Sequence, residues 1–239
     1  MIKAVFFDLD GTLLPLDENG FIKVYFGLLC KRMAPFGYDP NLLVKVIWEG
    51  TTAMYKNDGS KTNEEAFWEV FKAYYGEEKM KDKPYVDEFY INEFKETKNV
   101  CDDNPFALDI IKKCHDLNLI TVLSTNPIFP KAGTLTRMSF IGLKESDFDY
   151  ITFYENSRFA KPNPMYFMEL LKKYNLKPEE VVIFGNNTYE DGECSYACGI
   201  KCFIVGDYVI EHEKTKHSFE RLKMEEVISK IEELVNPNE

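Results

Sequence analysis

The chain has 239 residues, of which 45% are hydrophobic and 29% are charged, a balance typical of a folded globular protein. Its formal net charge of -11 argues against a nucleic-acid partner, because phosphate backbones are bound by basic patches. No segment reaches the ~18 apolar residues of a membrane span, so we expect no membrane partner. The six cysteines contain no C-x-x-C pair, which favours reduced thiols and a cytoplasmic location.

Short apolar runs that are typical of buried strands recur along the chain. They cover residues 2–9, 119–124, 150–153, 181–184 and 201–205. Helical patterns lie between the later runs, at 106–117, 164–174 and 189–198. Strands that alternate with helices of about a dozen residues predict an α/β fold, with a mostly parallel sheet covered by helices on both faces. We also expect a surface helix at 219–234.

The stretch from residue 17 to residue 98 differs from the rest of the chain. It shows helical periodicity, many aromatic residues and no clear strand. Its segment NDGSKTNEEAF predicts a loop that closes into a helix, with Thr62 or Asn63 near the N-cap and two glutamates in the first turn. We predict a core domain made of residues 1–16 and 99–239, interrupted by an all-α domain at 17–98.

The first apolar run ends in the sequence D-L-D-G-T. Residues i and i+2 of a strand point to the same side, so Asp8 and Asp10 should aim together at the strand's carboxyl end. Sites form at this edge in open α/β sheets, and Gly11 allows a sharp turn and a close ligand approach. Paired carboxylates suit a hard cation such as Mg²⁺, and one carboxylate can attack phosphorus while the other moves a proton. The alternative is an Asp-Gly turn with incidental charges.

With these residues the chain resembles the haloacid-dehalogenase-type (HAD) phosphohydrolases. The resemblance covers about residues 1–16 and 99–210. It implies a three-layer, doubly wound, Rossmann-like core, with a helical cap inserted after the first motif.

Two further segments match the family's order. In LITVLSTNP, Thr125 and Asn126 stand where the family binds the phosphoryl oxygens, with Ser124 as the out-of-register alternative. In FAKPNPMYF, Lys161 stands where an ammonium neutralises the phosphate and the attacking carboxylate. Read alone, the first segment could be a turn cap and the second an exposed loop lysine.

The fourth segment, VVIFGNNTYEDGECSYACGI, departs from the family at one position. Gly185 and Asp191 match, but Asn186 replaces an acid that normally binds Mg²⁺. A neutral amide oxygen is a weaker ligand. Asp191 and Glu190 could compensate, or the protein has drifted toward another use.

The resemblance implies a reaction in which Asp8 attacks a small phosphate ester and forms an aspartyl-phosphate. Asp10 would protonate the leaving oxygen and then deprotonate the hydrolytic water. Mg²⁺ would be held by Asp8 and Asp10, with Asn186 and Asp191 completing or supporting the shell. Lys161, Thr125 and Asn126 would bind the phosphoryl group, beside the Gly11 turn.

Two alternatives to the phosphatase remain open. One is a catalytically weak or inactive protein that binds phosphate or a partner, because Asn186 replaces the metal-binding acid. The other is a haloacid dehalogenase, although Asp10 favours a phosphate ester because a halide needs no proton. Cap cations such as Arg32, Lys56 and Lys61 could contact a phosphorylated metabolite or simply be solvated. The sequence identifies neither the natural substrate nor the oligomeric state.

Overall fold

The structure is a computed structural model that describes residues 1–236, so the last three residues of the predicted core domain lie outside it. Six strands form one sheet in the order β3-β2-β1-β4-β5-β6, and all five neighbouring pairs are parallel. The strands are β1 (Ala4–Phe7), β2 (Ile120–Leu123), β3 (Tyr150–Ile151), β4 (Val181–Gly185), β5 (Lys201–Val205) and β6 (Glu220–Leu222).

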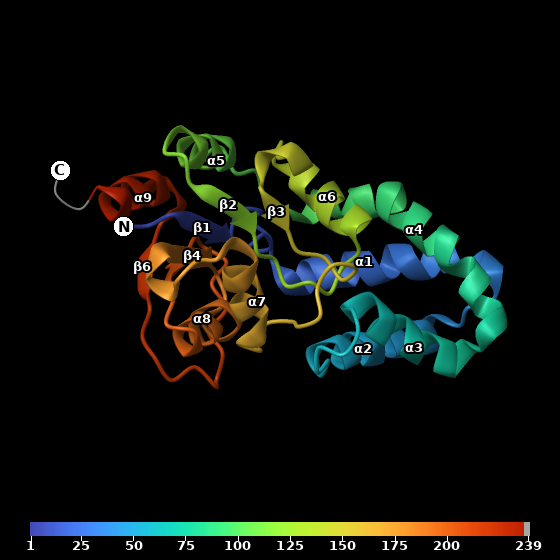
Figure 1. The fold of residues 1–239 in the computed structure, drawn as a ribbon. Helices are drawn as coiled ribbons and strands as arrows, with labels where there is room; N and C mark the ends of the chain where they lie inside the picture. Colours follow the sequence, from blue (N-terminus) through green and yellow to red (C-terminus); the bar gives the residue numbers. More distant parts are fainter. Residues whose placement is uncertain (237–239) are drawn as a thin grey trace.

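Helices cover both faces of this sheet, which confirms the predicted three-layer α/β fold (Figure 1). Val5 and Phe7 of β1 pack into one apolar cluster with α5 (Ala107–Asp116) and α9 (Val227–Val235). The alternate residues of β1 pack into a second cluster with α7 (Met165–Tyr174) and α8 (Cys194–Ala197). Because β1 is buried on both faces, its sequence is apolar throughout rather than alternating.

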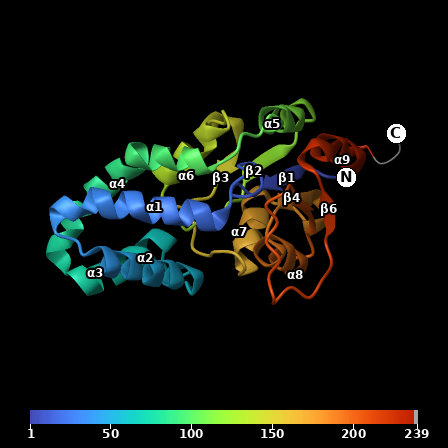
Figure 2. The same ribbon diagram turned by 180° about the vertical axis from the view of Figure 1, so that it is seen from behind.

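Between β1 and α5 the chain is helical. It forms α1 (Glu18–Met33), α2 (Pro40–Tyr55), α3 (Asn63–Tyr75) and α4 (Lys83–Ile91), then 3-10 turns through Val100. Thr62, one of the two residues predicted near the N-cap, caps α3, and it does so in a capping box with Glu65. Figures 1 and 2 show α1 between α4 and the α2–α3 pair, all beside one end of the sheet.

Two helix predictions were wrong in part. The segment predicted as a helix at 219–234 begins with the edge strand β6, and only its second half forms α9. The helix expected at 189–198 is instead a π-helix at Thr188–Glu193 followed by the short α8. A further helix, α6 (Lys131–Phe140), was not predicted.

Across residues 1–236, no helix combines the length and apolarity needed to cross a bilayer. All six cysteines are free thiols, and four of them are buried. Burial raises the pKa of the Cys114 thiol to about 12, so this thiol is protonated and packs as a small apolar group.

Candidate active site

The carboxyl ends of the three central strands bring the predicted residues together. Phe7 of β1 is level with Leu123 of β2 on one side and with Phe184 of β4 on the other. The residues that follow these three, among them Asp8, therefore leave the sheet at one edge. Doubly wound folds form their sites at this edge, outside the carboxyl ends of the strands.

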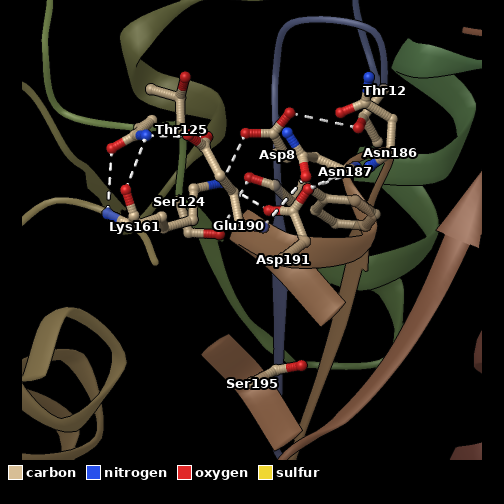
Figure 3. A network of polar contacts seen from close by, with 12 residues as sticks. Asp8, Thr12, Ser124, Thr125, Lys161, Asn186, Asn187, Glu190, Asp191 and Ser195 are labelled. Carbon is tan, nitrogen blue, oxygen red and sulfur yellow. Dashed lines mark hydrogen bonds and ion pairs between the residues drawn. The ribbon is translucent and has the colours of Figure 1, made fainter. Parts of the chain in front are cut away.

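Lys161 connects two of the carboxylates (Figure 3). Its Nζ lies 2.8 Å from Asp8 Oδ1 and 2.6 Å from Asp191 Oδ1, and all three side chains are buried. The second oxygen of Asp8 accepts a hydrogen bond of 3.3 Å from the Thr12 hydroxyl. One buried ammonium thus faces two buried carboxylates.

Burial and neighbouring charges together set the ionisation of Asp8 and Lys161. Desolvation raises the pKa of Asp8 to about 7, with Lys161 opposing the rise and Asp191 adding to it. The neighbouring Asp191 and Asp8 carboxylates outweigh the desolvation of Lys161 and hold its pKa well above the ordinary value. Lys161 is therefore a fixed positive charge at neutral pH.

The Asp191 carboxylate is held in place from both sides. Its Oδ2 accepts from the backbone N–H groups of Asn186 at 3.1 Å and Asn187 at 3.0 Å, while its Oδ1 meets Lys161. Asn187 caps the π-helix by accepting from the backbone N–H groups of Tyr189 and Glu190. Glu190 and Asp191 are consecutive residues of this π-helix, and both line the cavity beside Asp8. With both oxygens engaged, Asp191 holds Lys161 and the Asn186–Asn187 backbone in position.

Asp10 forms an ion pair with Arg137 of α6, whose guanidinium is fully buried and lies 4.2 Å from the centre of the Phe129 ring. Burial raises the pKa of Asp10, and Arg137 opposes that rise. The other oxygen of Asp10, Oδ1, is buried without a hydrogen-bond partner among residues 1–236. Arg137 was not among the predicted site residues, because the helix that carries it, α6, was not predicted.

Asn126 connects the core to the helical insertion. Its amide nitrogen donates to Glu190 Oε2 at 2.8 Å, and its Oδ1 accepts from the Lys161 backbone N–H at 3.1 Å. The Tyr55 hydroxyl, at the end of α2, donates to Glu190 Oε1 at 3.0 Å. Desolvation raises the pKa of Glu190 to about 7. These contacts hold the loop that carries Lys161. They also occupy most of the hydrogen-bonding groups of the Asn126 side chain.

Two other predicted residues, Thr125 and Gly11, line the cavity beside Asp8, and Ser124 does not. The Thr125 side chain faces this cavity, whereas the Ser124 hydroxyl donates to the Phe7 carbonyl and is fully buried. Gly11 has φ +78°, and a Cβ there would lie 2.0 Å from Asn186 Nδ2, so only glycine fits. The Gly11 N–H donates to the Leu14 carbonyl and is not free for a ligand.

The oxygen atoms around the cavity fit a hard cation. Asp8 supplies a carboxylate, and neither the Asp10 main-chain carbonyl nor Asn186 Oδ1 receives a hydrogen bond from residues 1–236. Mg²⁺ prefers such oxygens and keeps several waters. Only one of the three oxygens is charged, and the described chain holds no group of three His, Cys, Asp or Glu side chains arranged for a metal. These three oxygens fit Mg²⁺, but together they carry less negative charge than a site built from several carboxylates.

The fold and this strand-edge site define the chain as a member of a hydrolase family. The model of the haloacid dehalogenase-like hydrolases matches residues 5–205, and the chain belongs to that family. No sequence among the curated proteins matches the chain.

Several solved structures share the fold. A HAD phosphatase from Thermococcus onnurineus is 16% identical, with a TM-score of 0.61 over 96% of this chain and 98% of its own. A 2-haloacid dehalogenase from Pseudomonas syringae pv. Tomato is 17% identical, with a TM-score of 0.61 over 99% of both chains. CbbY from Rhodobacter sphaeroides, solved with phosphate, is 16% identical, with a TM-score of 0.57 over 93% and 94%. At these identities the likeness extends to the fold alone.

Proposed function

We propose that the protein is a cytoplasmic, Mg²⁺-dependent hydrolase of small phosphate esters that works through an aspartyl-phosphate on Asp8. The observation that carries the proposal is the contact of 2.8 Å between buried Asp8 and Lys161, at a cavity that Asp10 also lines. A dehalogenase would have no use for a second carboxylate that can protonate a leaving oxygen. We also propose that residues 1–16 and 99–239 form the core domain and residues 17–98 the cap.

The reaction has two steps, which transfer the phosphoryl group first to Asp8 and then to water. An Asp8 oxygen forms a bond to phosphorus while the bond from phosphorus to the alcohol oxygen breaks, and Asp10 gives that oxygen a proton. Asp10 then takes a proton from water, which attacks the phosphorus and returns the Asp8 carboxylate with inorganic phosphate. Lys161 and Thr125 stabilise the charge on the phosphoryl oxygens in both steps.

The proposed Mg²⁺ would be held by the Asp8 carboxylate, the Asp10 carbonyl and Asn186 Oδ1. When bound, it would add positive charge that favours both the ionised nucleophile and the phosphoryl group. Asp191 would support this shell by holding the Asn186 backbone and Lys161 in position.

The proposal is tested by assaying p-nitrophenyl phosphate with and without Mg²⁺. We expect turnover that chelation abolishes and added Mg²⁺ restores. An absence of turnover on a broad panel of phosphate esters, with phosphate still binding, would instead favour a phosphate-binding protein. Release of halide from 2-haloacids without metal would favour a dehalogenase.

Asn186→Asp is expected to tighten Mg²⁺ binding by about tenfold, because a carboxylate replaces a neutral ligand. Without metal the same change should lower the free energy of unfolding by about 1–3 kcal/mol. The reason is that Asn186 Nδ2 donates to the Tyr208 carbonyl at 2.7 Å, and a carboxylate oxygen there would face that carbonyl. Calorimetric Mg²⁺ titration and thermal unfolding, each with and without chelator, measure both effects.

Asn187→Asp is the matched control for this variant. It adds the same charge one residue further on, where the side-chain oxygen already caps the π-helix and an aspartate can do the same. Equal or weaker Mg²⁺ binding by Asn186→Asp relative to Asn187→Asp would remove Asn186 from the metal shell.

A further inference from the structure

The candidate site opens into a cavity of about 550 Å³ that continues between the helices of the insertion. Asp8, Asp10 and Lys161 lie at one end of it. The walls beyond them come from α1 to α4 and from the segment before α6, and most of their side chains are aliphatic or aromatic. Representative wall residues are Leu29, Leu43, Ile47, Phe67, Phe71 and Phe129. A cavity of this size encloses ligands of the size of drugs, which occupy pockets of about 300–1,000 Å³.

The polar groups in this apolar part are already paired with one another. The hydroxyls of Tyr25 and Tyr90 share a hydrogen bond of 2.9 Å, and Trp68 Nε1 donates to the Tyr154 hydroxyl at 3.3 Å. The Thr51 hydroxyl donates to the backbone of its own helix. A substrate hydroxyl that entered this space would lose its water and find few unpaired partners, which is unfavourable.

One cationic side chain lines the cavity in the described part of the chain. Among its lining residues within 1–236, Lys161 is the single Lys or Arg, and the acids Asp17, Glu18 and Asp207 also line it. The cap cations suggested by the sequence do not line it: Arg32 pairs with Glu88 and Glu93 elsewhere in the insertion. Lys161 can serve one phosphate, so a second phosphate or a carboxylate on the substrate would meet repulsion without a partner.

We infer that the substrate is a monophosphate ester whose alcohol part is apolar and uncharged, an aryl or medium-length alkyl group. This inference rests on the proposed hydrolysis at Asp8 and adds the substrate class. The phosphate lies at Lys161 and the apolar part extends between α1, α2 and α4. The transfer is the one described above, with the apolar alcohol leaving with the proton from Asp10.

The first test measures kcat/KM for ethyl, butyl, hexyl and octyl phosphate, with phenyl phosphate as the aryl case. Each buried methylene should raise kcat/KM about fourfold until the cavity is filled. Glucose 6-phosphate and phosphoglycolate should be turned over more slowly than butyl phosphate. A series that is flat in chain length, or a preference for these two polar esters, overturns the inference and leaves the hydrolase standing.

A second test does not depend on turnover. Both tryptophans of the chain, Trp48 and Trp68, line the cavity, so their fluorescence reports what enters it. Alkyl phosphonates, which cannot be hydrolysed, should change this fluorescence with a Kd that falls as the chain lengthens. Such binding without turnover of any ester would overturn the hydrolase and keep the apolar pocket. A Kd that is independent of chain length would overturn the pocket assignment.

A pair of variants tests whether the preference for long alkyl chains arises in the cavity. Ile47→Asn puts an amide into the apolar wall and should lower kcat/KM for octyl phosphate about tenfold more than for ethyl phosphate. Ile91→Asn makes the same change at the exposed end of α4, outside the cavity, and should leave the ratio of the two substrates unchanged. Equal ratios in the two variants would contradict the inference; if Ile47→Asn does not fold, the fluorescence series with the unaltered protein decides.

Discussion

Replacing Asp8 by Asn is expected to lower the hydrolysis of p-nitrophenyl phosphate by about 10⁴-fold or more, because an amide cannot form the covalent intermediate. The side chain keeps its shape, and its Oδ1 can still accept from Lys161. Loss of activity should therefore occur with the fold intact. Initial rates measure the first effect, and circular dichroism with thermal unfolding measures the second.

The matched control is Asp109→Asn, an exposed position on α5 that should leave the rate unchanged. Acid quenching of the unaltered enzyme during turnover should trap one phosphoryl group on the peptide that contains Asp8, and mass spectrometry detects it. Appreciable activity in Asp8→Asn, or a phosphoryl group on another residue, would contradict the assignment of the nucleophile.

Lys161→Met is expected to lower the free energy of unfolding by about 3–5 kcal/mol in mildly alkaline buffer, in addition to removing activity. Without the ammonium, the buried Asp8 and Asp191 carboxylates repel each other and neither has a counter-charge. Urea unfolding measures the loss. Lys172→Met, at an exposed position on α7, should change stability by less than about 0.5 kcal/mol.

The loss in Lys161→Met should shrink as the pH falls. Lys161 lowers the pKa of Asp8, so its removal raises that pKa further above the unfolded value. A carboxyl whose folded pKa is raised favours the folded state at low pH and loses this contribution as the pH increases through the unfolded and folded values. The double variant Lys161→Met/Asp191→Asn should recover part of the loss. A deficit that is independent of pH and of Asp191 would show that packing, rather than charge, is the cause.

The sequence predicted the part of the site that depends on strand ends. Asp8 directly follows β1 and Thr125 is the second residue after β2, and parallel strands place their carboxyl ends at one edge. Lys161 was found from its motif, since it lies ten residues beyond the end of β3. The strand β6 was missed because its residues are mostly exposed, so it lacks the apolar signal of the central strands.

The contacts that the sequence did not predict come from packing between distant segments. Arg137 reaches Asp10 from a helix more than a hundred residues away, and Tyr55 reaches Glu190 from the insertion. No local pattern encodes either pairing. The π-helix was missed for another reason: its backbone hydrogen bonds span five residues instead of the four of an α-helix, and it has no distinctive composition.

The Arg137 pair makes the two oxygens of Asp10 chemically unequal. The guanidinium occupies Oδ2 as a donor, so a proton carried by Asp10 belongs on Oδ1, the buried oxygen that has no hydrogen-bond partner in the described chain. Arg137 would thus select one protonation isomer of the carboxyl group before any ester arrives. The departing alcohol oxygen would then take its proton from Oδ1, so Arg137 would help to fix how the ester has to be oriented against Asp10.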